Sequence, residues 1–425
     1  MKVLVVGGGG REHALVRALA RSPRATELLC APGNAGIAQD ARCLQLGPSD
    51  VDGIVAAARD EGAGLVVVGP EAPLVAGIVD ALEAEGVPTF GPSADAARIE
   101  SSKIYAKELM AEAGVPTASH VVLSSHEETI AHLARASYPA VLKADGLAAG
   151  KGVIIAPTEA EARAAADVFF IEQRFGETRV VLEEHLDGEE LSLMALCDGE
   201  NVLPLTPAQD YKRIGDGDSG PNTGGMGSYS PVPEIDAARA EEIADVVHRP
   251  VLEAMRARGV AFHGVLYAGL MIGEAGPKVL EFNCRFGDPE AQAVMPRLRS
   301  DLVELCLAAR EPGGLADVEV GFSDEWAVSV VMASAGYPAS SSEGDVITGL
   351  DEATGKGIEV THAATRIEGG EVVTSGGRVL NVTGLGADPG AARDRAYDAV
   401  ARIRFEGAQM RTDIAARAVE RVRAS

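Results

Sequence analysis

Ten consecutive residues, Glu281–Glu290 with the sequence EFNCRFGDPE, bring several strongly polar groups close together. The apolar run 278–280 precedes them, which predicts a strand with Glu281 and Asn283 two apart on one face. A carboxylate and an amide oxygen are hard ligands, suited to Mg²⁺ (or Mn²⁺) rather than to a soft metal. Arg285 continues that face, and its planar guanidinium suits a phosphate or an acyl phosphate. Metal ligands beside such an arginine indicate phosphoryl transfer.

The segment 3–15, VLVVGGGGREHAL, predicts a strand, a glycine loop and a helix start. Exposed amides at a helix N-terminus bind phosphate. A dinucleotide-binding loop fits less well, because Glu12 stands where a third glycine is needed and no acidic residue ends the next strand, 27–30. We therefore expect a mononucleotide-like phosphate site, with a plain tight turn as the alternative. The candidate phosphate-binding residues are Gly8, Gly9, Gly10 and Arg11.

Two further loops follow predicted strands of the same sheet, PGNAG at 32–36 and GPEAPLVAG at 69–77. In open parallel sheets, ligands bind at the carboxyl ends of the strands. Asn34 and Glu71 could therefore meet hydroxyl groups or an amine of a substrate.

A lysine and a glycine loop follow the apolar strand that ends near 143. The loop DGLAAGKG, at 145–152, offers backbone amides that suit a triphosphate, although it lacks the spacing of a Walker A loop. An ordinary hairpin is the alternative. The candidate residues are Lys143, Gly150, Lys151 and Gly152.

The segment 209–227 holds six glycines in nineteen residues, with Asp210, Lys212 and Arg213 near its start. Loops this long and rich in glycine are usually functional or disordered. The clustered charges favour a functional loop.

The composition of the 425-residue chain favours an enzyme of small molecules. Its length predicts roughly two to four domains. The net charge of −25 argues against a nucleic-acid partner, which would need clustered Lys and Arg. We expect no membrane partner, because no apolar stretch reaches ~18 residues, and no signal peptide. The five cysteines include no CxxC pair, so we expect reduced thiols and a cytoplasmic protein.

The predicted elements indicate an α/β and α+β protein with four units. Residues 1–100 read as an open parallel α/β domain, and 101–187 as a small α+β unit that carries the glycine loop as a lid. Residues 188–325 would hold the metal site, and 326–425 would form a C-terminal α+β domain. The predicted helices are near 12–21, 75–85, 101–114, 158–170, 236–258, 289–310 and 389–404.

Taken together, these segments resemble the ATP-grasp ligases. The string EFNCRFGDPEAQ and the PGNAG loop resemble the phosphoribosylamine–glycine ligase family in particular, and the resemblance extends over nearly the whole chain. It implies an N-domain, an ATP-grasp pair of α+β units that sandwich ATP, and a C-terminal domain. It also implies that ATP, glycine and 5-phosphoribosylamine give glycinamide ribonucleotide, ADP and phosphate. We expect a monomer that uses ATP and Mg²⁺ (or Mn²⁺).

The resemblance also implies roles for residues whose pattern alone indicates little. The segment 180–192 would otherwise be read as a strand and a solvated acidic loop. By resemblance, Asp210 would hold the ammonium of glycine, with Arg285 near its carboxylate or the later acyl phosphate, and Lys212 would complete the catalytic set. The implied ATP contacts are Lys103 for phosphate, Glu183, Glu184 and Leu186 for adenine, and Glu190 for ribose.

Two alternatives remain open. Another ATP-grasp carboxylate–amine ligase, or a biotin-independent purine carboxylase, is the competing enzyme. A nucleotide-binding regulatory protein without turnover is the competing non-enzyme. In addition, residues 260–273 contain no Asp or Glu, so a second metal carboxylate on the preceding strand is in doubt.

Overall fold

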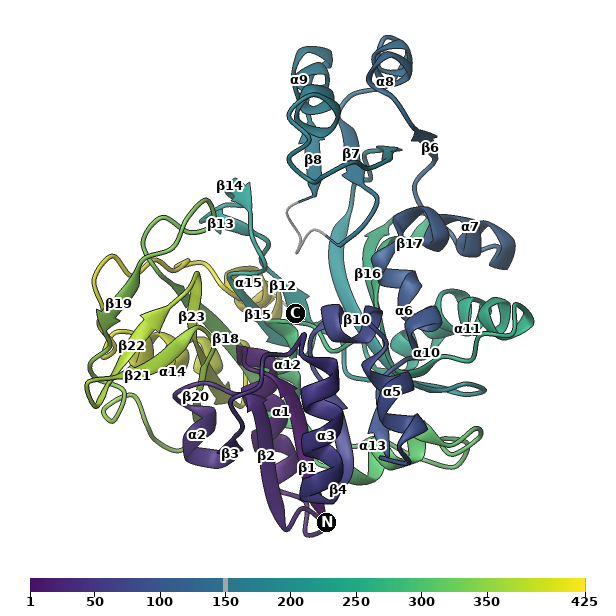
Figure 1. Ribbon diagram of the computed structural model, residues 1–425. Coiled ribbons are helices and arrows are strands. Elements are labelled where there is room, and N and C mark those ends of the chain that lie inside the picture. Colours follow the sequence, from purple (N-terminus) through teal and green to yellow (C-terminus); the bar gives the residue numbers. More distant parts are fainter. Residues whose placement is uncertain (148–151, 425) are drawn as a thin grey trace.

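The computed structural model describes residues 1–147 and 152–424, and begins with a five-stranded parallel sheet in the order β3-β2-β1-β4-β5 (Figure 1). The central strand β1 is buried from Val3 to Val6, as expected for a strand covered on both faces. The predicted open parallel α/β unit is confirmed. Its elements are β1 (Lys2–Gly7), α1 (Gly10–Ala20), β2 (Glu27–Pro32), α2 (Ile37–Asp40), β3 (Arg42–Cys43), α3 (Val51–Glu61), β4 (Ala63–Val68), α4 (Glu71–Val75), α5 (Ile78–Ala84), β5 (Thr89–Phe90) and α6 (Ala94–Ser101).

A small antiparallel sheet, in the order β6-β9-β7-β8, projects from the rest of the molecule and carries two helices on one face (Figure 1). Its own hydrophobic core joins Leu142 and Leu182 of the sheet to Phe169 of a helix. We call this sheet and its helices the lid. Its elements are β6 (His120–Leu123), α8 (His126–Leu133), β7 (Ala140–Ala144), β8 (Val153–Ala156), α9 (Glu159–Phe170) and β9 (Val180–Glu184).

The lid faces a second antiparallel sheet, in the order β11-β10-β16-β17, which we call the central sheet. Thr117 joins the two regions, because its hydroxyl donates to the carbonyl of Val279 at 2.6 Å. The central region comprises α7 (Lys103–Ala113), β10 (Glu189–Asp198), β11 (Val202–Pro204), α10 (Ala237–Val246), α11 (His248–Ala257), β16 (His263–Gly273), β17 (Gly276–Asn283), α12 (Glu290–Val294), η1 (Met295–Arg297) and α13 (Leu302–Arg310).

The C-terminal part contains a five-stranded sheet in the order β12-β15-β18-β23-β20 and an outer sheet in the order β19-β22-β21. Strand β12 begins the glycine-rich segment 209–227 and β15 starts at its last residue, so both ends of the segment are fixed to the C-terminal sheet. The elements are β12 (Gln209–Asp210), β13 (Arg213–Gly215), β14 (Ser219–Asn222), β15 (Gly227–Ser230), β18 (Trp326–Ala333), β19 (Glu343–Val346), β20 (Ile358–His362), β21 (Thr365–Glu368), β22 (Glu371–Ser375), β23 (Arg378–Gly386), α14 (Pro389–Val400) and α15 (Ala416–Ala424).

Three of the predicted helices were wrong in their extent. The helix expected over 236–258 is α10 and α11, because Pro250 lacks the amide proton that would bond the carbonyl of residue 246. The helix expected over 289–310 is α12, η1 and α13, with Pro296 in the 3₁₀ turn between them. The helix expected over 75–85 breaks at Gly77, whose φ of 84° lies in the left-handed region.

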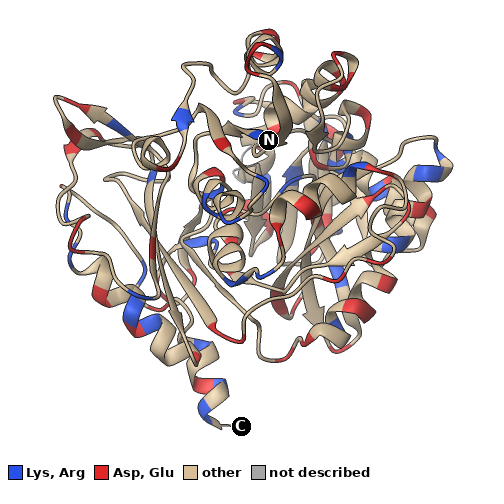
Figure 2. Cartoon of the chain, turned by 90° about the horizontal axis from the view of Figure 1, so that it is seen from below, with Lys and Arg blue, Asp and Glu red and all other residues tan. Residues whose placement is uncertain are grey.

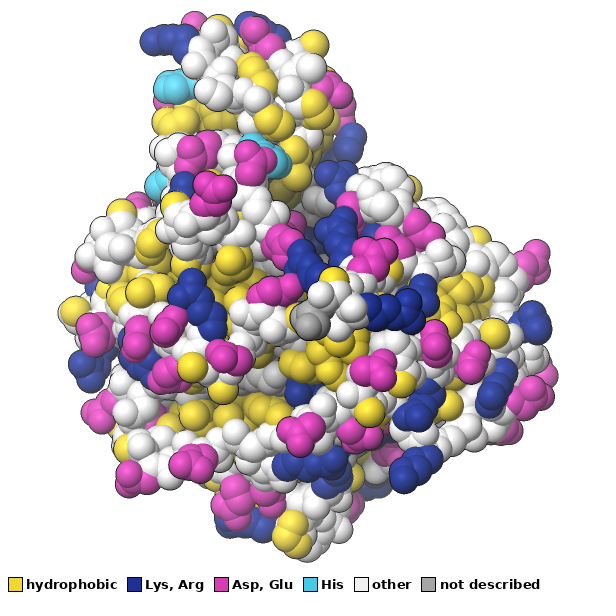
Figure 3. Space-filling model, turned by 180° about the vertical axis from the view of Figure 1, so that it is seen from behind, with side chains coloured by type: hydrophobic (Ala, Val, Ile, Leu, Met, Phe, Trp, Pro, Cys, Tyr) yellow, Lys and Arg dark blue, Asp and Glu magenta, His cyan; other side chains and the backbone are white. Residues whose placement is uncertain are grey.

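Figure 3 shows acidic and basic side chains interspersed over one face of the molecule, and Figure 2 shows residues of both charges spread along the chain. Within the described ranges, the helices are all too short or too polar to span a bilayer.

A buried histidine predicts that stability depends on pH. His248 is fully buried, and burial lowers its pKa from 6.5 to about 4, although its ring nitrogen lies 3.2 Å from the carbonyl oxygen of Leu193. The unfolded chain therefore binds a proton that the folded chain does not, so this contribution is complete above pH 6.5 and is lost as the pH falls toward 4. The shift corresponds to at most about 3 kcal/mol.

The urea midpoint should therefore fall between pH 7.5 and pH 5, and the fall should be smaller in His248→Gln, which keeps a donor but does not titrate. His132→Gln, an exposed histidine of α8, is the matched control and should behave like the parent. An equal fall in all three proteins would contradict this role of His248.

Candidate functional site

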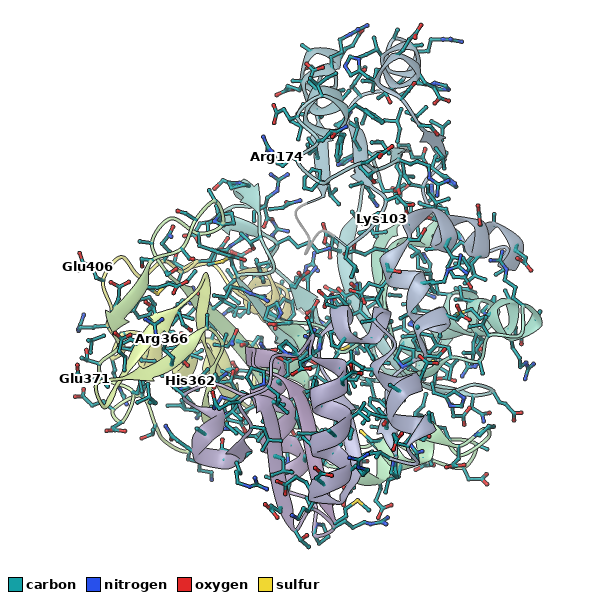
Figure 4. All side chains as sticks on the ribbon, in the orientation of Figure 1. Lys103, Arg174, His362, Arg366, Glu371 and Glu406 are labelled. Carbon is teal, nitrogen blue, oxygen red and sulfur yellow. The ribbon has the colours of Figure 1, made fainter. Side chains whose placement is uncertain are left out.

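A cavity of about 430 Å³ lies between the lid and the central sheet and extends to the N-terminal and C-terminal parts. This volume is within the usual range for small-molecule sites. Figure 4 shows Lys103 at the start of α7, beside the lid. The cavity is lined by these predicted site residues: Arg11, Glu71, Lys103, Lys143, Gly152, Glu183, Glu184, Leu186, Glu190, Asp210, Lys212, Glu281, Asn283 and Arg285.

The end of β17 presents Glu281 and Asn283 to this cavity, and Arg285, expected to continue the strand, lines it from just beyond the strand end. Arg285 donates to the Asn283 side-chain oxygen at 3.1 Å, and its guanidinium also lies 3.1 Å from Glu100 and 3.4 Å from Glu71. The guanidinium is thus held by two carboxylates before any ligand binds. The side-chain oxygens of Glu281 and Asn283 therefore lie near the Arg285 guanidinium, as phosphoryl transfer with a bound metal requires.

Glu281 is surrounded by cations. Burial would raise the pKa of its carboxyl, but Lys212, Lys143, Lys103 and Arg285 together hold that pKa below its ordinary value. Among the described residues, no hydrogen bond or ion pair engages the Glu281 side chain. An ionised, unengaged carboxylate beside an amide oxygen fits a divalent cation with oxygen ligands. No group of three or more His, Cys, Asp and Glu suited to a metal occurs in the described part of the chain, so the rest of the coordination sphere would come from other oxygens.

Glu183 lies between two lysines. Its carboxylate oxygens are 3.1 Å from the Lys107 ammonium and 3.0 Å from the Lys143 ammonium, and all three side chains are buried. Lys143 also donates to the carbonyl of Leu280 at 2.9 Å, which joins the lid to β17. Sequence reasoning gave Lys107 no role. Its position four residues after Lys103 on one helix face was the available signal.

The strand end at Glu184 leads into an apolar part of the cavity. Glu184 itself is occupied at the surface, where it accepts from the Ser119 amide at 3.0 Å and from Lys278 at 3.4 Å. An apolar part of a cavity suits an aromatic base. The apolar lining comes from Val141, Ile155, Leu186, Met271 and Leu280.

Asp210, Lys212 and Glu190 form a second charged group. The Lys212 ammonium lies 2.8 Å from the Glu190 carboxylate. Burial raises the pKa of Asp210 well above its ordinary value, and the neighbouring Glu290 and Glu190 carboxylates add to this effect while Lys212 opposes it. A cationic ligand beside Asp210 would favour the ionised form of this carboxyl, and the resulting ion pair would stabilise the bound ligand.

Two residues beside this group had no predicted role, and only one of them lines the cavity. Glu290 lies in the cavity wall and accepts hydrogen bonds from Ser192 at 3.0 Å and Tyr267 at 2.9 Å. Tyr211, which had no predicted role, faces away from the cavity under the guanidinium of Arg411, 4.7 Å from its ring centre. Asp210 and Lys212 line the cavity, whereas Tyr211, between the end of β12 and the start of β13, does not.

The N-terminal loops contribute unequally. Arg11 and Glu71 line the cavity, and Arg11 contacts Glu12 at 2.6 Å and the carbonyl of Phe286 at 3.2 Å. Asn34 does not line the cavity. Its amide donates to the carbonyls of Gly8 and His362, while its oxygen accepts from two backbone amides of its own loop.

Gly8, Gly9 and Gly10 form the turn into α1 but are not in the cavity wall. Gly150 and Lys151 of the predicted lid loop lie outside the described residues.

Three family models match successive parts of the chain. They are the phosphoribosylglycinamide synthetase N domain over residues 1–100, the ATP-grasp (A) domain over 101–291 and the C domain over 327–417. The two antiparallel sheets that enclose the cavity therefore form an ATP-grasp domain.

Curated relatives agree over the full length. A phosphoribosylamine–glycine ligase of Streptomyces coelicolor is 54% identical over 98% of this chain and 99% of its own length, and one of Mesorhizobium japonicum is 48% identical over 100% of both. The crystal structure of a phosphoribosylamine–glycine ligase from Thermotoga maritima has a TM-score of 0.82 and 34% identity, covering 97% of this chain and 100% of that one. The chain belongs to the phosphoribosylglycinamide synthetase family.

More distant structures share the fold alone. The biotin carboxylase of Campylobacter jejuni has a TM-score of 0.71 at 15% identity and covers 96% of this chain.

The charge arrangement predicts the effect of neutralising Glu281. Glu281→Gln should lower turnover by at least ~10²-fold, on the scale of one lost preorganised electrostatic group, while leaving the fold intact because the residue ends a strand at a cavity. Glu274→Gln, an exposed residue in the turn between β16 and β17, is the matched control. Near-parental turnover of Glu281→Gln at low Mg²⁺ would place the metal elsewhere.

Proposed function

We propose that this chain joins glycine to 5-phosphoribosylamine with ATP, giving glycinamide ribonucleotide, ADP and phosphate in de novo purine biosynthesis. The family and its full-length relatives support this reaction. The observation that carries it is the ionised Glu281 carboxylate facing Lys103, Lys143, Lys212 and Arg285 in one cavity. Such a site can hold a metal–triphosphate and offset the charge that develops during phosphoryl transfer.

ATP would lie between the lid and the central sheet. The adenine would occupy the apolar part of the cavity near Glu183, Glu184 and Leu186, with its ribose at Glu190. Glu281 and Asn283 would hold the divalent cation, Mg²⁺ or Mn²⁺, which offsets phosphate charge when bound. The residues proposed to contact the phosphates are Lys103, Lys143, Gly150, Lys151 and Gly152.

Glycine would bind beside these phosphates, with its ammonium at Asp210 and its carboxylate at Arg285. Its carboxylate oxygen attacks the γ-phosphorus and ADP leaves, which forms glycyl phosphate. The phosphoribosylamine nitrogen then attacks the acyl carbon, phosphate leaves and the nitrogen loses a proton. Lys212 would stabilise the transferring phosphoryl group. Acyl phosphates hydrolyse, so the enclosed cavity protects the intermediate from water.

The acceptor would enter from the N-terminal part, where Arg11 and Glu71 line the cavity. Its phosphate would be held by the turn Gly8, Gly9 and Gly10 with Arg11, since amides at a helix start bind anions. The contacts of Asn34 support an indirect role, in which it holds this turn against the C-terminal part.

We further propose that the chain acts as a monomer and that it is cytoplasmic. The five free cysteines support the cytoplasmic location. The proposed units are residues 1–100, 101–187, 188–325 and 326–425. Strands β12 and β15 come from before residue 326 and pair with the C-terminal sheet, so the last two units would share a sheet.

The reaction predicts a strict substrate requirement. ADP formation should need a divalent cation, glycine and 5-phosphoribosylamine together, with glycinamide ribonucleotide as the second product by mass spectrometry. Comparable turnover with bicarbonate in place of glycine would favour a carboxylase, and ATP binding without turnover would favour a regulatory protein.

The separate acceptor site predicts a selective effect of Arg11. Arg11→Ala should raise the KM for phosphoribosylamine roughly 10- to 150-fold, because a charge-assisted phosphate contact contributes about 1.5–3 kcal/mol. The KM for ATP should stay within a few-fold of the parental value, since ATP would bind between the lid and the central sheet. Arg59→Ala, an exposed arginine on α3, is the matched control. A change in ATP affinity with an unaltered phosphoribosylamine KM would instead support dinucleotide-type binding.

A further inference from the structure

Asp288 stands where the N-terminal, central and C-terminal parts meet, and no sequence pattern assigned it a role. It lines the cavity three residues after Arg285 in the chain. One carboxylate oxygen lies 3.8 Å from the position that a Cβ on Gly9 would occupy, so the residue adjoins the turn into α1. Burial would raise the pKa of Asp288, but Arg378, Arg11, Gln292 and Arg285 hold it below its ordinary value. The group is therefore an ionised acceptor of hydrogen bonds.

Both carboxylate oxygens of Asp288 are fixed by side chains. The Gln292 amide donates to one at 2.8 Å, and the Arg378 guanidinium lies 2.9 Å from the other. Each carboxylate oxygen retains further acceptor capacity after one such contact. A carboxylate held in this way can accept hydrogen bonds from the hydroxyl groups of a sugar.

Arg378 comes from the C-terminal part and spans three segments. It is the first residue of β23, beside an irregularity in the pairing with β18 that can redirect a side chain. One guanidinium nitrogen donates to the carbonyl of Asp288 at 3.0 Å and also to the carbonyl of Gly224 in the glycine-rich segment. Gly225 packs so closely on this region that a Cβ there would lie 2.3 Å from Pro289. Arg378 thus fixes Asp288 and the glycine-rich segment to each other.

We propose that Asp288 binds the sugar hydroxyls of the acceptor and that Arg378 is the positioning residue that orients it. The location supports the acceptor rather than ATP, because the groups that lie around Asp288 in the described part of the chain come from the turn into α1, Arg285, α12 and β23, which lie outside the lid. This inference rests on the proposed ligation of an aminated ribose phosphate.

The test is a set of steady-state constants for the full-length enzyme with each substrate varied in turn. Asp288→Asn and Arg378→Gln should each raise the KM for phosphoribosylamine about 10- to 150-fold, the range of a charge-assisted contact, and leave the KM values for ATP and glycine within about three-fold. Arg378→Lys should recover part of the loss, because it keeps the charge but not the planar fork.

The double variant separates positioning from general support. Because Arg378 acts through Asp288, the variant with both Asp288→Asn and Arg378→Gln should have a phosphoribosylamine KM little higher than that of Asp288→Asn alone. Arg366→Gln is the matched control, since Arg366 lies on the outer sheet, where it pairs with Glu343 and Glu368 (Figure 4). It should behave like the parent.

An unaltered phosphoribosylamine KM in soluble Asp288→Asn or Arg378→Gln would overturn the inference. An equal rise of the KM values for phosphoribosylamine, ATP and glycine would overturn it as well, since that pattern would mean that Asp288 and Arg378 only hold the parts of the chain together. Failure of the proposed function looks different, because the parent enzyme itself would then form ADP without needing phosphoribosylamine.

Discussion

The site depends on charge compensation inside a partly closed cavity. Two triads, Lys107–Glu183–Lys143 and Glu71–Arg285–Glu100, place opposite charges within 3.0–3.4 Å before any ligand binds. Such pairs need additional hydrogen bonds to offset desolvation, and Lys143 and Arg285 make them to backbone carbonyls. Glu281 is the exception, since it is ionised by its surroundings without a direct partner among the described residues. A metal ion bound to a phosphate can supply the partner that this carboxylate lacks.

The same constraint explains how separate parts of the chain share one reaction centre. The lid contributes Lys143 and Glu183, the central sheet contributes Glu281, and the N-terminal part contributes Glu71. The ion pairs cross these parts, since Lys107 of α7 pairs with Glu183 of the lid, and Arg285 pairs with Glu71 of the N-terminal part. The C-terminal sheet includes β12, which carries Asp210, and Arg378 of β23 also lines the cavity. Chemistry and folding are therefore coupled through contacts between parts distant in sequence.

Local patterns predicted the parallel N-terminal sheet, the strand that carries Glu281, and a lysine at the end of β7. These features depend on periodicity within a few residues. The pairing of Lys107 with Glu183, or of Arg378 with Asp288, joins positions 76 and 90 residues apart in the sequence, and nothing local specifies it. The helix breaks near Pro250 and Gly77 were missed, although proline and glycine chemistry signals such breaks. Asn34 was predicted as a substrate contact from its loop, but its partner His362 lies 328 residues away.

The central claim is that a glycine carboxylate oxygen is phosphorylated in this cavity before the amine attacks. With glycine labelled by ¹⁸O in both carboxylate oxygens, one label should leave in the released phosphate and one should stay in the amide of the product. Mass spectrometry of the phosphate during a single turnover measures this directly. Phosphate free of ¹⁸O, with both labels retained elsewhere, would contradict the account.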